Sequence, residues 1–310
     1  MARAEAVQGG RVADAGGSWT PLRRIEALWA LFFISPALLG LLAFTIIPVI
    51  ASLLLSFVNW NMIREPEFIG LDNYAHALSD ATFWKVMFNT TYYTLGTVPT
   101  GIALSLALAV MLNQKLRGVT FLRTLYFLPV VSSTVAVALV WRTLYNPDWG
   151  IINYALSSIG IPPIGWLTTT TWAMPAVILM SVWKGLGYNM VIFLAGMQGI
   201  PRHLYDAAAV DGATAWQRFW HITLPLLSPT TFFVTVISVI GSFQVFQQVY
   251  VMTSGGPAKA TSTIVFYLYE QAFLEFKMGY ASALAWLLFA VIFIFTLIQF
   301  RYQREWVYYE

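Results

Sequence analysis

The sequence predicts an all-α membrane protein with six transmembrane helices. Of its 310 residues, 58% are hydrophobic and 10% are charged, whereas soluble domains carry roughly 25% charged residues. The apolar residues gather in stretches of about twenty or more, the length that a helix needs to cross a hydrocarbon core of roughly 30 Å. The chain contains no cysteine, which excludes a disulfide framework, a thiolate metal site and a thiol nucleophile.

The N-terminal segment, residues 1–27, differs from the rest of the chain. It is rich in Gly and Ala, carries several arginines, and lacks the short apolar core and cleavage site of a secretory signal. We expect it to form a disordered cytoplasmic arm. The apolar stretch 28–58 is too long for a signal core, so it is predicted to be the first span, with Pro36 and Pro48 kinking the helix or marking its ends.

Five further apolar segments follow the first span. They cover residues 86–112, 121–145, 172–197, 227–252 and 280–300. The transmembrane domain is therefore predicted to cover residues 28–300, followed by a cytoplasmic tail at 301–310.

The distribution of Lys and Arg indicates which side is cytoplasmic, because cytoplasmic loops carry an excess of these residues. Most lie in the N-terminal arm, the connections after the second and fourth spans, or the C-terminal tail: Arg3, Arg11, Arg23, Arg24, Lys115, Arg117, Arg123, Arg202, Arg218, Arg301 and Arg304. The opposite segments hold Arg64, Lys85, Arg142, Lys259 and Lys277. We therefore expect both termini in the cytoplasm.

The connection between the fourth and fifth spans, residues 198–226, is predicted to fold as two short helices. Pro201 suits a first helical position, and Gly212 can adopt the left-handed conformation that ends a helix. Four residues at helical spacing share one face of the first helix: Leu204, Ala207, Ala208 and Asp211. A helix with alanines on its contact face can approach another protein closely, so the hairpin is a candidate docking element.

The second helix of this hairpin has its own start and stop signals. Thr214 and Gln217, three residues apart, match a capping box. Pro225 is expected to close the unit.

The same loop carries a recognisable motif. It reads Asp206-Ala-Ala-x-x-Asp-Gly-Ala213, followed by Phe219, Ile222, Leu224-Pro225 and Pro229. This motif resembles the EAA loop of binding-protein-dependent ABC importer permeases. Segments 68–74, 123–129 and 250–257, with Thr263 and 279–281, are similar to the carbohydrate branch of that family, which includes maltose and glycerol-3-phosphate permeases. The resemblance covers about residues 28–300 in order.

This resemblance implies the type I ABC importer permease fold, in which the loop engages an ATPase. The residues that it assigns to coupling are Asp206, Ala207, Ala208, Asp211, Gly212, Ala213, Leu224 and Pro225. Two positions depart from the family pattern. Asp206 stands where the family has Glu, which shortens the reach of the carboxylate, and Gln247 stands where an Asp is common.

The resemblance also implies a set of partners. These are a homologous second permease subunit forming a heterodimer, a dimer of ATPase subunits, an extracytoplasmic solute-binding protein or lipoprotein, and membrane lipid, with no nucleic acid. ATP and Mg²⁺ would be bound by the ATPase, so the chain itself would hold no cofactor and no metal. The implied location is the cell (inner) membrane of a bacterium or archaeon, as a multi-pass protein with its N-terminus inside.

Two other classes of membrane protein fit the sequence less well. A lipid-linked glycosyl or acyl transferase would need a general base or metal ligands clustered near the membrane surface, and the acidic residues outside the spans are scattered. A secondary carrier usually places carboxylates or a His pair within its spans, and these spans have neither. No Gly-x-x-x-x-Gly-Lys-Ser/Thr phosphate loop occurs in the chain, so a P-loop ATPase site must lie on a separate protein.

Polar and aromatic residues within the spans suggest a substrate pathway. Lys184 lies deep in the fourth span, where a lysine costs about 2.5–3.5 kcal/mol unless it finds water or a partner. It should face the pathway or a subunit interface, or else hydrogen-bond helix ends or extend toward the headgroups. The pathway candidates are Tyr93, Lys184, Tyr188, Asn189, Gln244 and Gln247.

The substrate is expected to be a carbohydrate, either an oligosaccharide or a disaccharide. A phosphorylated substrate of the glycerol-3-phosphate type, the alternative, would favour several cations along the pathway, and only Lys184 is well placed. The sequence therefore favours a neutral sugar.

Overall fold

A computed structural model describes residues 21–63, 65–114 and 117–307. The chain divides into two compact units, Met1–Ser52 and Leu53–Glu310, and each is described by itself. The first 20 residues of the predicted arm and residues 308–310 of the predicted tail lie outside the described residues.

The first unit contains one long helical segment. It comprises α1 (Pro21–Leu41), the π-helical turn η1 (Leu42–Ile46) and most of α2 (Ile47–Leu55), whose last three residues belong to the second unit. Within the described residues this segment is already helical from Pro21, so residues 21–27 of the predicted disordered arm are helical and precede the predicted start of the span at residue 28. Ile25–Leu55 is long and apolar enough to cross a membrane.

The two prolines of this segment do not end it. Pro36 lies inside α1 and Pro48 inside α2. Proline cannot donate a backbone hydrogen bond to the preceding turn. Directly before Pro48, the Ile47 amide donates to the Leu42 carbonyl five residues back, so the irregular turn falls where proline would interrupt the α-helical ladder.

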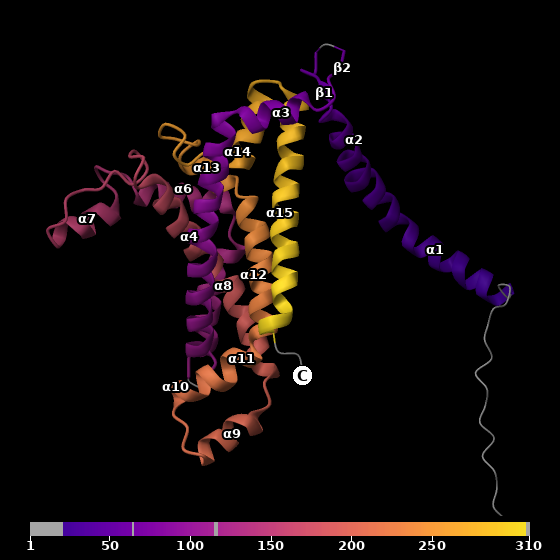
Figure 1. The fold of residues 1–310 in the computed structure, drawn as a ribbon. Coiled ribbons are helices and arrows are strands. Elements are labelled where there is room, and N and C mark those ends of the chain that lie inside the picture. Colours follow the sequence, from indigo (N-terminus) through magenta and orange to yellow (C-terminus); the bar gives the residue numbers. More distant parts are fainter. Residues whose placement is uncertain (1–20, 64, 115–116, 308–310) are drawn as a thin grey trace, which may run out of the picture. The chain divides into compact units, whose positions relative to one another are not determined.

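The second unit is a bundle of long helices that lie side by side in Figure 1. Its four central helices are α4 (Ala81–Leu112), α8 (Ala173–Gly199), α12 (Ser228–Phe243) and α15 (Met278–Trp306). The α4–α8 pair makes the most extensive contact, and α12 packs against the other three. The helix α5 (Val119–Val131) packs along α8.

Shorter elements gather at the two ends of this bundle. At one end lie α9 (Arg202–Val210), α10 (Ala215–Arg218), η2 (Phe219–Thr223) and α11 (Leu224–Leu226). At the other end lie the strands β1 (Val58–Asn59) and β2 (Glu67–Phe68), α3 (Asp72–Ser79), α6 (Thr134–Leu144), α7 (Ile151–Ser158), α13 (Gln247–Met252), α14 (Ile264–Tyr269) and η3 (Glu270–Leu274). The strands pair antiparallel, with Val58 opposite Phe68.

Four of the predicted spans appear as long apolar helices in the described chain. They are Ile25–Leu55, Ala81–Leu112, Ala173–Gly199 and Met278–Gln303. The other two are less regular, and the described helices amount to six spans only if each bent pair is one span. An all-α membrane protein is thus supported, with four to six spans.

The predicted span 121–145 is not one straight helix. The chain bends by 99° between α5 and α6. Pro129 lies in the last turn of α5, and Ser132 and Ser133 adopt extended ψ angles of 144° and 130°. Because proline and two serines favour non-helical backbone, the helix ends here although hydrophobicity continues on both sides.

The predicted span 227–252 is also interrupted. α12 ends at Phe243, and Phe246, with φ −137° and ψ −59°, separates it from the short helix α13. At its start, α12 is bent by 64° from the preceding helical segment Ala215–Leu226. The stretch therefore contains a bend at its start and a helix break before α13.

The close approach of α5 and α8 depends on a glycine. A Cβ atom placed on Gly187 would lie 2.2 Å from the backbone oxygen of Tyr126. No side chain fits in that space, so glycine lets the two backbones touch.

Candidate functional site

The α9 helix ends in a well-defined glycine cap. Pro201 is its N-cap, one position before the predicted one, and Gly212 has φ +77°. The Ala213 amide donates to the Ala208 carbonyl at 2.8 Å and the Gly212 amide to the Ala209 carbonyl at 3.1 Å. This pair of bonds is a Schellman motif, which confirms the predicted left-handed stop at Gly212.

The next helix begins with the predicted capping box. The Gln217 amide donates to Thr214 Oγ1 at 3.3 Å, and the Thr214 amide donates to Gln217 Oε1 at 2.8 Å. The two caps fix the turn between α9 and α10. The Tyr205 hydroxyl and Thr223 Oγ1, 2.9 Å apart, further join α9 to η2.

Pro225 does not close the unit as predicted. The π turn η2 runs directly into α11, so the helix passes through Leu224 and Pro225 and changes direction only before Ser228. Pro225 lies in the first turn of α11, where a missing amide hydrogen costs little. Leu224 and Pro225 thus form part of the helical connection between the hairpin and α12.

The hairpin is anchored on one side and free on the other. Leu204 packs against a buried cluster that includes Met197 and Leu227, so the predicted alanine face of α9 is shared between the bundle and solvent. Asp206 and Ala207 are exposed, Ala208 and Ala213 are half-buried, Asp211 and Gly212 are exposed, and Leu224 and Pro225 are half-buried. Between the two arms lies a hollow of about 310 Å³.

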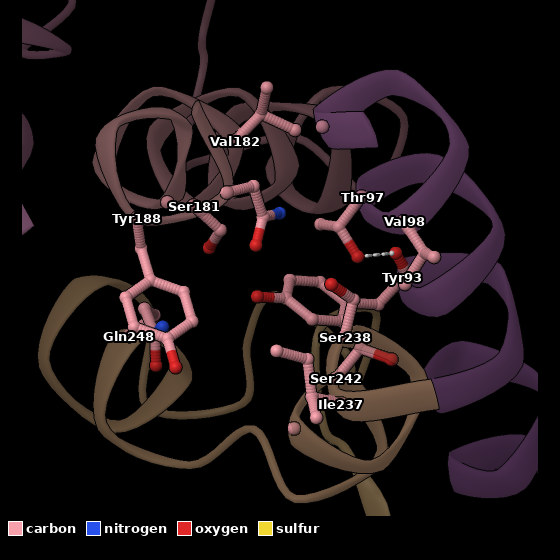
Figure 2. Close-up of a pocket in the computed structure, with 14 residues that line it drawn as sticks. Tyr93, Thr97, Val98, Ser181, Val182, Tyr188, Ile237, Ser238, Ser242 and Gln248 are labelled. Atoms are coloured by element: carbon pink, nitrogen blue, oxygen red, sulfur yellow. Dashed lines mark hydrogen bonds between the residues drawn. The ribbon is translucent and has the colours of Figure 1, made fainter. Parts of the chain in front are cut away.

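A second site lies inside the bundle, between α4, α8, α12 and α13. It is a cavity of about 430 Å³ lined by Tyr93, Thr97, Val98, Gly101, Ser181, Val182, Gly185, Tyr188, Asn189, Ile237, Ser238, Gly241, Ser242 and Gln248. Figure 2 shows the Tyr93 side chain extending between Ser181 on one side and Ser238 and Ser242 on the other. None of these lining residues carries a formal charge.

Three of the six predicted pathway residues meet in this cavity: Tyr93, Tyr188 and Asn189. Lys184 does not line it, although its neighbour Gly185 does, because successive residues of a helix point about 100° apart. Gln244 and Gln247 are exposed at the break between α12 and α13, and Gln248 lines the cavity instead. The break rotates this segment away from the orientation that a continuous helix would give it.

Serine and threonine hydroxyl groups on the cavity wall were not predicted from the sequence. Ser238 and Ser242 lie four residues apart with Gly241 between them, a small polar face of α12 that could have been noticed from its spacing. The Thr97 hydroxyl donates to the Tyr93 carbonyl at 2.8 Å, and the Ser181 hydroxyl donates to the Val177 carbonyl at 2.8 Å. Each oxygen keeps lone pairs that can accept a hydrogen bond from a ligand.

The second unit is a bundle of apolar helices with an uncharged polar cavity and a helical hairpin at one end. This architecture is that of a membrane permease. Residues 100–307 match the family described as the binding-protein-dependent transport system inner membrane component, and the chain belongs to that family.

The curated relatives agree with this assignment. The chain is 42% identical to the probable ABC transporter permease protein YesP of Bacillus subtilis, over 90% of this chain and 91% of that protein. It is 36% identical to the lactose transport system permease protein LacF of Rhizobium radiobacter, over 93% and 98% of the two chains. It is 34% identical to the trehalose/maltose transport system permease protein MalF of Thermococcus litoralis, over 91% and 96%.

The fold is also similar to a solved transporter. A chain of a bacterial ABC transporter involved in import of the acidic polysaccharide alginate aligns with a TM-score of 0.80 and 26% identity, over 91% of this chain and 98% of that one. A bacterial alginate ABC transporter in complex with an alginate pentasaccharide-bound periplasmic protein gives a TM-score of 0.81 at 26% identity, over 92% of this chain and 96% of that one. The chain is therefore a permease subunit and not an enzyme, and its ATPase is a separate subunit.

Proposed function

We propose that this chain translocates an oligosaccharide or disaccharide that an extracytoplasmic binding protein or lipoprotein delivers. The observation that carries the proposal is the uncharged cavity inside the bundle, with hydroxyl, amide and phenol groups on its wall. Such groups donate hydrogen bonds to sugar hydroxyls and accept hydrogen bonds from them. Because the groups are neutral, binding does not require a buried charge to lose its water. Relatives named for lactose and for trehalose/maltose transport support the same substrate class.

The cavity suits part of a saccharide in size and shape. Its volume of about 430 Å³ lies within the roughly 300–1,000 Å³ of small-molecule sites. Tyr93 and Tyr188 supply aromatic surface for the apolar faces of sugar rings, while Asn189 and Gln248 supply amides. A second permease subunit of the heterodimer would cover the open side of this cavity.

The alternative substrate, of the glycerol-3-phosphate type, is less compatible with the cavity. A phosphate carries strong charge and is usually held by Arg, Lys or backbone amides at a helix N-terminus. The lining residues of the cavity include no cation, and Lys184 lies beside the lining residues rather than among them. We therefore propose a carbohydrate without a phosphate group.

The hairpin formed by α9 and α10 is proposed to dock on the ATPase subunit. Asp206, Ala207 and Asp211 are exposed on it, and the Schellman motif at Gly212 fixes its turn. The helical connection through Leu224 and Pro225 to α12 supplies a path toward the cavity. An ATPase dimer with its ATP and Mg²⁺ would close against this surface and move α8 and α12 relative to α4.

The proposed topology has six spans, counting each bent helix pair as one, in a bacterial or archaeal cell membrane. Both termini and the hairpin lie in the cytoplasm, and α7, α13 and α14 face outward. The Lys and Arg distribution supports this orientation.

The experiment that tests the transport proposal is uptake of radiolabelled saccharides into proteoliposomes that contain the complete complex and its binding protein. Asn189→Ala combined with Ser238→Ala should lower uptake, because each loss leaves sugar hydroxyls without partners. Complex abundance and basal ATPase rate serve as controls for assembly. Unchanged uptake with the double variant would remove the cavity from the pathway.

A further inference from the structure

A second hollow lies at the outward end of the bundle, separate from the central cavity. It has a volume of about 320 Å³ and is lined by Arg142, Tyr145, Asn146, Pro147, Leu167, Thr168, Met252, Thr253 and Ser254. These residues come from the end of α6, the segment before α8, and the end of α13. Nothing in the proposed coupling or in the central cavity uses them.

The cation of this hollow has no protein partner. Among the residues that the structure describes, Arg142 forms neither an ion pair nor a hydrogen bond. The nearest carboxylate along the chain, Asp148, lines a different hollow and lies beyond ion-pair distance of Arg142. The exposed guanidinium therefore keeps all five of its N–H groups for a ligand.

A second donor is held beside Arg142. Asn146, four residues further on, accepts hydrogen bonds at its Oδ1 from the amides of Asp148 at 2.9 Å and Trp149 at 3.2 Å. These two bonds fix the side-chain amide, so its NH₂ group is left to donate elsewhere. Arg142 and Asn146 together present donors and no carboxylate.

Hydrogen bonds hold two walls of the hollow in place. Tyr145 is 1% exposed, and its hydroxyl donates to the Ala176 carbonyl at 3.1 Å. On the facing side, the hydroxyl oxygens of Thr253 and Thr261 are 2.7 Å apart. A preformed wall of this kind lowers the entropy cost of binding.

The hollow and the central cavity are both lined by residues of α13. Gln248 lines the central cavity and Met252, four residues later on the same helix, lines the outer hollow. Four residues of helix rise about 6 Å. The lining residues of the two hollows are therefore about one helical turn apart on α13, a short distance for an oligosaccharide to span.

We propose that this outer hollow is a saccharide subsite that binds a carboxylate-bearing sugar, with Arg142 as the residue that selects for it. The guanidinium would hold the sugar carboxylate through two parallel N–H···O bonds, and the Asn146 amide would donate to a ring hydroxyl. The proposal rests on the proposed carbohydrate transport and narrows its substrate to acidic oligosaccharides. It also revises the neutral sugar favoured by the sequence, which weighed only Lys184.

The test compares matched acidic and neutral probes. Uptake into proteoliposomes with the complete complex is measured for uronate trisaccharides built from guluronate, mannuronate or galacturonate, and for the same trisaccharides after reduction of their carboxyl groups. We expect Arg142→Gln to lower uptake of the uronate form by roughly tenfold or more, the effect of losing a charge-assisted bond, and to leave the reduced form unchanged. Arg142→Lys keeps the positive charge but loses the planar guanidinium that can form two parallel hydrogen bonds. Its uptake of the uronate form should therefore lie between that of the wild type and that of Arg142→Gln.

A control separates local binding from a general charge effect. Lys277→Gln removes the same charge from the predicted outer side at an exposed residue that is paired with Glu275, away from the hollow. It should affect neither probe. Two results would overturn the acidic subsite and leave carbohydrate transport standing. One is a wild type that takes up only the neutral trisaccharides. The other is an Arg142→Gln variant whose uptake of the uronate and reduced forms falls equally. Uptake of no saccharide at all would overturn both.

Discussion

The Tyr267 hydroxyl donates a 2.8 Å hydrogen bond to Asp80 Oδ2 and so ties α14 to the beginning of α4. Asp80 is the N-cap of α4, and its Oδ1 accepts from the Thr82 amide at 2.8 Å. One carboxylate thus caps a long helix and holds a segment 187 residues away in sequence. Tyr280 of α15 lies 3.4 Å from the same oxygen.

Removing this carboxylate should loosen the end of the bundle where α14 meets the start of α4. Asp80→Ala loses the helix cap and the Tyr267 partner, and we expect a cost of about 1–2 kcal/mol, mostly from the cap. Asp80→Asn keeps an acceptor for Thr82 and should cost less. Thermal unfolding of the purified complex measures both, and equal midpoints for Asp80→Ala and wild type would contradict the assignment.

The same residue predicts a pH dependence. Burial acts to raise the pKa of Asp80, but the hydrogen bonds from Tyr267 and Thr82, with nearby His76, hold it below its ordinary value of 3.8. A carboxyl whose folded pKa is depressed contributes stability that is complete above its unfolded pKa and is lost as pH falls through the folded pKa. The stability difference between wild type and Asp80→Asn should therefore be constant from pH 7 to about 5 and shrink below about pH 4. A difference that persists undiminished to pH 3 would show that the charge of Asp80 is not involved.

The sequence predicted the helical hairpin in detail because its signals are local. A positive φ at Gly212 and the exchange of bonds between Thr214 and Gln217 depend on residues within a single turn. The spans at α4, α8 and α15 were likewise predictable, since hydrophobic length alone defines them.

The breaks within the spans could not be predicted in the same way, nor could the choice of which pathway candidates line the cavity. Apolar residues lie on both sides of Ser132 and of Phe246, so a hydropathy profile averaged over a whole span does not show that the helices stop there. The break before α13 is also why Gln248 lines the cavity while Gln244 and Gln247 do not. Lys184 does not line the central cavity, because the direction in which a helical residue points relative to neighbouring helices does not follow from its position in the sequence.

The packing of α5 on α8 gives a third prediction. Gly187→Ala would place a methyl group 2.2 Å from the Tyr126 backbone oxygen, and backbone cannot move aside as a flexible side chain can. We expect destabilisation of about 1–3 kcal/mol, as for other overpacked contacts. Gly199→Ala, at a position with no atom within 4 Å of the added carbon, is the matched control. A similar melting temperature for both variants would contradict the close contact.

The Schellman turn gives a fourth prediction, on coupling. Gly212→Val places a β-branched residue at φ +77°, where L-residues pay about 1–2 kcal/mol, so the α9 hairpin should lose its fixed direction. Uptake should fall several-fold, either because the ATPase dissociates or because its hydrolysis no longer responds to the binding protein. Gly212→Asn tolerates the left-handed conformation and should retain most activity. Normal ATPase retention, stimulated hydrolysis and uptake in Gly212→Val would show that the hairpin is not the coupling element.

The final prediction concerns orientation in the membrane, and the cysteine-free chain makes it simple to test. Val210, 89% exposed at the end of α9, and Ser254, exposed after α13, lie at opposite ends of the bundle. Because the Lys and Arg residues gather on the hairpin side, Val210 should face the cytoplasm and Ser254 the exterior. A membrane-impermeant maleimide applied to intact cells should label Ser254→Cys and should reach Val210→Cys only after the membrane is opened. Labelling of Val210→Cys but not Ser254→Cys in intact cells would reverse the topology and place the hairpin out of reach of a cytoplasmic ATPase.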